Sequence, residues 1–260
     1  MVEVAFIINS DGKVYQAKTS RTTNPAFNQA AEAAVLKWRF KPGLKDGKPV
    51  ATAARQVVEF SVDVLPVYPF ALAQAEIEGS ATVEFSRDEN GRPFDITIIA
   101  ASRPEFGRAL QAAITASTYA PSFDGGHVAV KGLRTTMGFT PTGRKSLLDA
   151  ASRKILARLK TKENIPDESG LDQPLEAKVA PEPRLPQNLA ADQQVGFAII
   201  QAFVDEDGSV KLPSVDSTTN EELGYSAAQA VAGWKYAPPH IRGKSSLVRV
   251  KIRVDFKPKN

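Results

Sequence analysis

The chain contains no cysteine, and this absence excludes disulfides, thiolate nucleophiles and Cys-ligated metals. Histidine is almost as scarce. Only His127 and His240 occur, in non-equivalent loops, and neither has a second ligand at a spacing typical of metal sites. Asp205, Asp207 and Ser209 lack the glycine and distal glutamate of an EF-hand calcium loop, so hairpin solubility explains these acidic residues better. The sequence therefore predicts no enzyme, no catalytic residue, no metal site and no cofactor.

Long apolar runs are also missing. No stretch approaches the ~18 residues needed to cross a bilayer, and the first residues lack the basic region and apolar core of a signal peptide. The net charge of +4 is mild and shows no concentrated basic face, so no nucleic-acid binding is expected. A length of 260 residues with 42% hydrophobic and 24% charged residues suits a globular protein of two or three domains.

Three Asx-Gly pairs mark an internal repeat. When residues are counted forward from each glycine, matching types recur at offsets 15, 22, 23, 28, 30, 35 and 48 without a gap. Such a set of matches is not expected by chance, and it predicts one small unit built three times. In offset order, the three glycines Gly12, Gly91 and Gly208 are followed by Phe27, Phe106 and Leu223; Ala34, Ala113 and Ala230; Val35, Ile114 and Val231; Phe40, Tyr119 and Tyr236; Pro42, Pro121 and Pro238; Gly47, Gly126 and Gly243; and Phe60, Phe139 and Phe256.

The patterns inside each copy predict two strands, a helix and a third strand. Apolar residues alternate before the glycine, and Asx-Gly favours a tight hairpin turn in which both central residues have positive φ. After the second strand, apolar residues at helical spacing form one face of a helix, with Asn24 as N-cap and proline in the first turn at Pro25 and Pro104. The last strand alternates most cleanly from Val248 to Phe256, which indicates one buried and one solvated face.

The directions of these elements predict the topology. Strand 2 runs opposite to strand 1 and the helix returns the chain, so the simplest antiparallel sheet has the order 2-1-3 with the helix on one face. The fold class is therefore α+β, with three tandem β-β-α-β modules at residues 1–65, 66–141 and 184–260. The second module is degenerate, because Ser117 replaces the tryptophan found at Trp38 and Trp234. As an alternative for the sheet edges, strands of neighbouring modules could pair into one continuous sheet.

Residues 142–183 separate the second and third modules. Apolar residues at helical spacing predict an amphipathic helix from Lys145 to Lys162, which either packs against a neighbouring module or binds a partner. The following prolines, from Pro166 to Pro183, indicate an extended, mobile linker.

Two stretches of the chain resemble the TonB C-terminal domain family. Ala33 to Pro42, followed by Asp46-Gly47-Lys48-Pro49-Val50, is similar to the family pattern A-x-A-V-x-x-W-x-F-x-P with a later G-K-P-V. Tyr68-Pro69 to Gly79 is similar to the segment that usually leads into the family's first strand. All three modules lie inside the resemblance.

This resemblance implies a periplasmic cell-envelope protein of a Gram-negative-type bacterium. Proteins of this family link an inner-membrane proton-driven motor to outer-membrane receptors and grip a short extended receptor peptide. We expect either a TonB-like module that engages such peptides, as an energy transducer in transmembrane transport, or a structural adaptor that binds envelope proteins or peptidoglycan without transmitting force. The first module lacks the lead-in segment of the other two, so an anchor or signal peptide is expected to be missing from this chain.

The third strand of the last module is the predicted binding site. As an edge strand it can accept an extended peptide as an additional strand through main-chain hydrogen bonds. The residues of this predicted edge are Val248, Arg249, Val250, Lys251, Ile252, Arg253 and Val254. An alternative explanation for the alternating charges is protection of the edge against aggregation.

Overall fold

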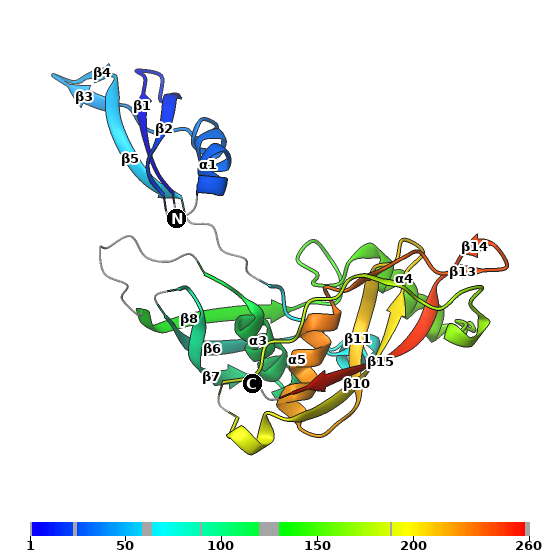
Figure 1. Cartoon of the computed structure of the whole chain (residues 1–260). Helices are drawn as coiled ribbons and strands as arrows, with labels where there is room; N and C mark the ends of the chain where they lie inside the picture. Colours follow the sequence, from blue (N-terminus) through cyan, green and yellow to red (C-terminus); the bar gives the residue numbers. More distant parts are fainter. Residues whose placement is uncertain are drawn as a thin grey trace. The chain divides into compact units, whose positions relative to one another are not determined.

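The computed structural model describes residues 2–22, 25–58, 64–88, 90–119, 130–187 and 189–257 (Figure 1). The chain divides into two compact units. The first contains residues 1–62 with 87–92 and 118–129, and the second contains residues 63–86, 93–117 and 130–260. Predictions that rest on Asn24, Phe60, Pro121, Gly126 and His127 lie outside the described residues.

Each module has its own three-stranded antiparallel sheet in which the first strand of the hairpin is central. The strand orders are β2-β1-β5, β7-β6-β8 and β11-β10-β15, which confirms the predicted order 2-1-3 and the α+β class. The strands are β1 (Val2–Ile8), β2 (Val14–Thr22), β5 (Thr52–Val58), β6 (Gly79–Arg87), β7 (Pro93–Ala101), β8 (Val130–Phe139), β10 (Gly196–Val204), β11 (Val210–Thr218) and β15 (Val248–Phe256).

The hairpin glycine and the aromatic residue at offset 28 are in contact with each other in every module. In the third module the N–H of Tyr236 donates to the carbonyl oxygen of Gly208 at 2.8 Å. A Cβ atom on Gly208 would lie 2.0 Å from the carbonyl oxygen of Tyr236, so no larger residue fits. The same two contacts join Gly12 to Phe40 and Gly91 to Tyr119. The glycine and the aromatic residue recur together because the segment that follows the helix is bonded to the hairpin.

The hairpin turns are of a different type from the one expected. Gly208 has φ +85°, but the preceding Asp207 is not in the positive-φ region, and the Gly208 N–H donates to the Asp205 carbonyl at 2.8 Å. This is a four-residue turn that ends in a glycine bulge, so the prediction that both central residues have positive φ is wrong here. The two-residue turn occurs instead at offset 35, where Arg242 and Gly243 have φ +51° and +71°. It joins β13 (His240–Ile241) to β14 (Lys244–Ser245), as Asp46-Gly47 joins β3 (Gly43–Lys45) to β4 (Lys48–Val50).

One helix packs on a face of each sheet. The helices are α1 (Asn28–Val35, after the short 3-10 turn η1, Pro25–Phe27), α3 (Pro104–Ala116) and α5 (Glu221–Val231). In α3 the predicted apolar face is buried, and in α5 Asn220 caps the helix by accepting the Glu222 N–H at 2.8 Å. The first helix departs from the prediction, because its apolar face is only partly buried and Phe27 is 39% exposed. Tyr236 is a core residue, while Trp38, Phe40 and Trp234 are partly buried against the cores.

The lead-in segment of the second module supplies part of that module's core. Tyr68 is buried, and its ring makes edge contacts with Phe106 and Phe139, both at 5.7 Å between ring centroids. Its hydroxyl donates to the Ile77 carbonyl at 2.7 Å, just before β6. Burial, with the nearby carboxylate of Glu78, raises the pKa of Tyr68 to about 12, so the hydroxyl stays a donor. The short helix α2 (Phe70–Gln74) lies within this segment.

In the second unit the second and third modules pack helix against helix, through α3 and α5 (Figure 1). Gln229 of α5 is buried and is hydrogen-bonded to the segment that leads into the second module. Its Nε2 donates to the Leu65 carbonyl at 3.0 Å, and its Oε1 accepts the Val67 N–H at 3.2 Å. Arg108 of α3 pairs with Glu221 of α5 at 2.6 Å. Within the described residues of the second unit, the sheets of the second and third modules are separate, so these two modules do not form the continuous sheet of the alternative.

The amphipathic helix between these modules is present but shorter than predicted. It is α4 (Ala150–Lys160), and it begins after Asp149, whose carboxylate accepts the Ser152 N–H at 2.7 Å. Ile155 and Leu156 are buried. Asp149 also pairs with Lys211 of β11 at 2.6 Å, and Lys160 pairs with Glu76 after α2. These contacts with both modules favour the packing interpretation of this helix.

Candidate peptide-binding edge

Strand β15 has the alternation that its sequence predicts. Its inner residues Val248, Val250, Ile252, Val254 and Phe256 are buried in the core of the third module, while Lys251, Arg253 and Asp255 are exposed and Arg249 is half-buried. The strand pairs with β10 in a continuous register from Val248 opposite Val204 to Phe256 opposite Gly196. Strand β15 is therefore paired with the centre of its sheet along its whole length.

The outer side of β15 is partly covered by the chain itself. The N–H of Arg249 points away from β10 and donates to the carbonyl of Pro166 at 2.8 Å, and Asp167 forms an isolated bridge with Arg249. Peptide groups in a strand alternate between its two sides, so those of Lys251, Arg253 and Asp255 also point outward. Beyond Arg249, the described residues place no strand on this outer side.

Residues 166–181, here called the strap, continue from this bridge across the third module. Asp172 binds the turn before β14: its carboxylate accepts the N–H groups of Arg242 and Gly243, both at 2.7 Å, and its own N–H donates to the His240 carbonyl at 2.9 Å. The hydrogen bonds from the Gly243 and Arg242 N–H groups hold the pKa of Asp172 below its ordinary value. The carboxylate is therefore ionised, and the contact persists, at neutral pH.

The end of the strap is hydrogen-bonded to Trp234 and to the strand that follows it. Strand β9 (Ala177–Val179) pairs with β12 (Lys235–Tyr236), and the Trp234 Nε1–H donates to the Pro181 carbonyl at 3.0 Å. Leu171 and Leu175 pack against the core of the module. The segment predicted as a linker is therefore docked on the third module. It is extended, as expected, but it is bonded to the third module because its leucines and Asp172 find partners there.

A cavity of about 500 Å³ separates the strap from β15. Its walls are Glu168, Leu171, Asp172, Gln173, Pro174 and Leu175 on the strap side and Tyr236, Val250, Lys251 and Ile252 on the module side. The strap thus contacts the edge at Arg249, lies away from the edge over the next residues, and contacts the module again at Asp172. Space therefore remains beside the middle of the strand.

The outward cations of β15 already have partners. Lys251 pairs with Asp216 at 3.0 Å, and Arg253 pairs with Asp255 at 2.9 Å while its guanidinium lies 4.2 Å from the Phe197 ring centroid. The Nε of Arg249 is buried without a hydrogen-bond partner among the described residues. Charge on this edge is therefore largely compensated, which leaves the peptide groups as its main unpaired feature.

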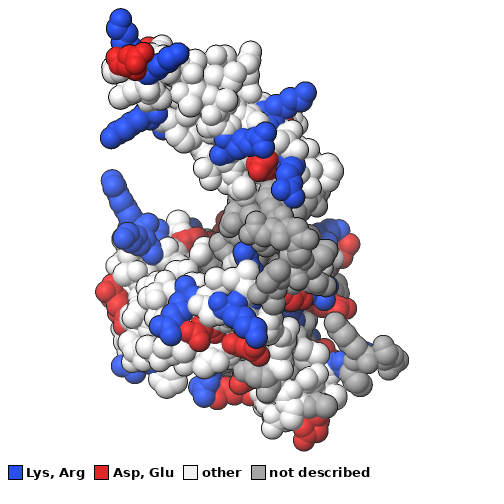
Figure 2. Space-filling model, turned by 90° about the vertical axis from the view of Figure 1, so that its left-hand side faces the viewer, with Lys and Arg blue, Asp and Glu red and all other residues white. Residues whose placement is uncertain are grey.

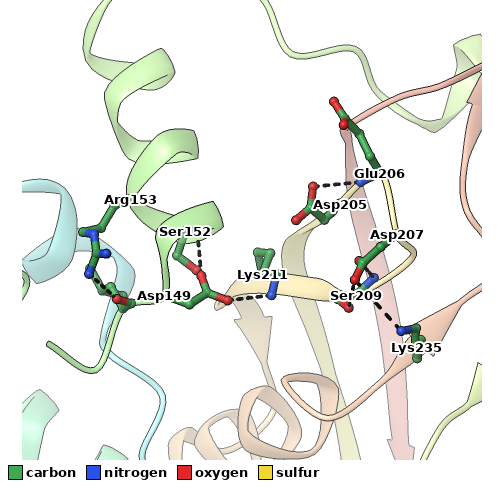
Figure 3. A network of polar contacts seen from close by, with 10 residues as sticks. Asp149, Ser152, Arg153, Asp205, Glu206, Asp207, Ser209, Lys211 and Lys235 are labelled. Carbon is green, nitrogen blue, oxygen red and sulfur yellow. Dashed lines mark hydrogen bonds and ion pairs between the residues drawn. The ribbon is translucent and has the colours of Figure 1, made fainter.

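The acidic hairpin of the third module is a network of local contacts (Figure 3). The Asp205 carboxylate accepts the Glu206 N–H at 2.8 Å, and the Asp207 carboxylate accepts the Ser209 N–H at 2.8 Å and its hydroxyl at 3.0 Å. The hydrogen bonds from Ser209 lower the pKa of Asp207. These side chains hold the turn in shape. In the described part of the chain, no three His, Asp or Glu side chains are grouped so as to hold a metal ion.

Charged side chains of both signs are interspersed over the face of the molecule drawn in Figure 2. His240 is exposed, and its Nδ1 lies 2.8 Å from the Pro238 carbonyl. No helix in the described ranges is long and apolar enough to span a membrane.

The sequence-based prediction of the site included β15 but missed the strap. Proline and scattered acidic residues are typical of linkers, so the composition around Pro166 and Asp172 predicts a linker and not a docked segment. The signal that could have identified a docked segment is the pair Leu171 and Leu175, since two leucines four residues apart are unusual in a purely solvated spacer.

Strand β15 is thus an edge strand that, beyond Arg249, has no strand on its outer side among the described residues, and such an edge can accept an added strand from a partner. The comparison with protein families agrees. The family model described as "Gram-negative bacterial TonB protein C-terminal" matches residues 1–62, 64–141 and 181–258. The chain belongs to this family, in three tandem copies, and the family is one of protein-interaction domains of the Gram-negative cell envelope. A search of the curated proteins gave no match.

Proposed function

We propose that the third module binds an extended segment of an outer-membrane receptor or another envelope protein as an added strand on β15. The partner strand would lie along Lys251 to Asp255, where the outward peptide groups have no strand beside them among the described residues. This open stretch of edge is the single observation that carries the proposal. Of the predicted site, Val248 and Arg249 would be reached only after the strap moves, because Pro166 occupies that position.

Main-chain pairing rather than charge would supply the affinity. The side chains of Lys251 and Arg253 are 58% and 57% exposed and already paired, and an ion pair at such a site contributes only about 0.2–1 kcal/mol. Each new main-chain hydrogen bond contributes a net ~0.5–1.5 kcal/mol, and several form together in a strand. The binding would therefore depend on backbone geometry more than on the charge of the partner.

The test uses the whole chain, isotope-labelled, and a synthetic peptide of about nine residues, a strand's length, from the periplasmic N-terminus of an outer-membrane receptor. The amide signals of residues 251–255 are expected to shift on titration. Arg253→Pro removes an outward N–H that β10 does not use, so the fold tolerates it, since proline is accepted on edge strands. We expect it to weaken peptide binding roughly tenfold, which corresponds to about 1.4 kcal/mol.

The matched control is Arg253→Ala, which removes the charge and keeps the N–H. This variant should bind the peptide nearly as well as the unchanged chain. If alanine and proline weaken binding equally, the side chain and not the backbone makes the contact, and strand addition is refuted. No shift of the β15 signals at millimolar peptide would also refute it.

The second candidate function is a structural adaptor that holds envelope proteins, or peptidoglycan, without transmitting force. The observation that favours it is the fixed coupling of two modules through α3, α5 and α4, because a scaffold needs binding sites at constant separation. A transducer would need a membrane anchor in the complete gene product. Sequencing upstream of this chain therefore separates the two: a long anchor helix favours transduction in energy-dependent transport, and a cleavable signal peptide favours the adaptor.

A further inference from the structure

A second cavity, of about 450 Å³, lies inside the second unit where α2, α3, α5 and β11 meet. Its volume falls in the range of small-molecule sites, about 300–1,000 Å³. Its walls are mainly apolar, and they include Phe70 and Leu72 of α2, Ala109 and Ala112 of α3 and Pro213 and Val215 of β11. Because Leu72, Ala109 and Ala112 are buried residues, the inner wall of the cavity is shielded from solvent.

Three carboxylates reach this apolar space. Glu221 is paired with Arg108 at 2.6 Å, and Asp216 is paired with Lys251 at 3.0 Å. The third, Glu105 in the first turn of α3, has its Oε2 atom buried without a hydrogen-bond partner among the described residues. Three carboxylates and two cations leave one uncompensated negative charge at the cavity.

An unpaired carboxylate oxygen beside an apolar wall is costly, because it has lost water without gaining a donor. Glu105 lies in the first turn of α3, where the helix N-terminus attracts negative charge. Tyr225 is beside the same space, and burial, with the Glu221 and Glu105 carboxylates, raises its pKa although Arg108 acts in the opposite direction. It therefore stays a neutral hydroxyl. The missing component is a cationic donor.

We infer that this cavity is a binding site for a small organic ammonium compound, whose cationic group pairs with Glu105 and whose apolar body lies against Phe70, Ala112 and Val215. An anion is disfavoured by the net charge of the lining, and a wholly apolar ligand would leave the Glu105 oxygen unpaired. The enclosed inner wall suits a compact small molecule better than an extended peptide. No residue of β15 lines the cavity, although the wall residue Asp216 pairs with Lys251 of that strand, and the inference does not require a peptide on β15.

The test is a titration of the full chain with phenethylammonium, its neutral isostere phenethyl alcohol and the anion phenylpropionate, followed by calorimetry and by the amide signals of Ala109 and Tyr225. The ammonium is expected to bind at least tenfold tighter than the alcohol, and the anion not at all. Glu105→Gln, which keeps the shape of the side chain, should abolish the preference for the ammonium. Glu182→Gln is the matched control. Glu182 is exposed and does not line the cavity, so this variant should keep the preference for the ammonium.

A second variant tests the location. Ala112→Leu fills the cavity from α3 and should abolish binding of every probe while the thermal unfolding of the chain confirms that it is folded. Equal affinity for the ammonium and the alcohol, preference for the anion, or no binding of the ammonium at millimolar concentration would each overturn the inference. Binding of a lysine-containing peptide without binding of the free ammonium would overturn it too, because the site would then belong to a protein partner.

Discussion

Replacing Gly208 by alanine is expected to destabilise the third module more than the same substitution at Gly243. Both glycines have positive φ, +85° and +71°, so alanine in either place costs about 1–2 kcal/mol from the backbone conformation alone. The two sites differ in what the new methyl group meets. At Gly208 it would lie 2.0 Å from the Tyr236 carbonyl oxygen, whereas nothing lies within 4 Å of it at Gly243.

The magnitude follows from that contact. Relief of a 2.0 Å approach requires the chain at Tyr236 to move away, which breaks the 2.8 Å hydrogen bond from Tyr236 to Gly208. A bond of this kind contributes a net ~0.5–1.5 kcal/mol. The Tyr236 ring, a core side chain, moves with the backbone and loses further packing. We expect about 2–4 kcal/mol for Gly208→Ala and about 1–2 kcal/mol for Gly243→Ala.

The assay is denaturant unfolding followed by tryptophan fluorescence. The chain has two tryptophans, so a Trp38→Phe background leaves Trp234, next to Tyr236, as the only reporter and makes the signal specific to the third module. Gly12→Ala and Gly47→Ala, measured through Trp38 in a Trp234→Phe background, repeat the comparison in the first module. Equal losses at the contact glycine and the open glycine would refute the reasoning, because the hairpin contact would then add nothing to the backbone term.

Two further predictions concern the strap and α4. Asp172→Ala removes the acceptor of two N–H groups, so we expect faster proteolysis within residues 166–181 and tighter peptide binding along β15. Glu182→Ala is the control, and unchanged proteolysis would show that Asp172 does not hold the strap. Asp149→Ala removes the N-cap of α4 and should cost about 0.5–2 kcal/mol at neutral pH. Burial raises the pKa of Asp149, but the hydrogen bonds from Lys211 and Ser152 outweigh it and lower the pKa overall. The stabilisation is therefore present above about pH 4, the unfolded value, and is lost as the pH falls through the folded pKa, so a penalty that stayed constant down to pH 2 would contradict the assignment.

The fold was predictable from the sequence to the extent that its contacts are local or repeated. Offsets counted from Gly208 predicted the hairpin, the helix and Val248–Phe256 as the last strand, since period and spacing report which side chains share a face. The turn type was not predictable in the same way. Asx-Gly is compatible both with the two-residue turn and with the bulged four-residue turn, and the tie of Gly208 to Tyr236 selected the second. The positive-φ residue four positions after each glycine, Leu212 in the third module, likewise left no mark in the sequence.

The candidate site was predictable only in part. Strand β15 follows from its alternation, but the extent of its open edge depends on Pro166, which is distant in sequence and reaches Arg249 only in the folded chain. The cavity at Glu105 was not predictable, because its walls come from several helices and strands of two modules. The sequence of α3 does not indicate whether its outward-facing alanines contact a second helix or water.

The amino-acid sequence alone determined that one sheet-and-helix module is built three times, because the strands and the helix of each module come from one continuous stretch of chain, such as Gly196 to Phe256 in the third. Tertiary structure decided how the helices of the second and third modules pack together, which part of β15 is left uncovered and where, among the described residues, a buried carboxylate oxygen lacks a partner. These properties arise when surfaces that could each be solvated pack against one another. The free energy of that packing depends on shape and on pairs of groups that are far apart in the chain, and the pattern of residues along the sequence does not encode either.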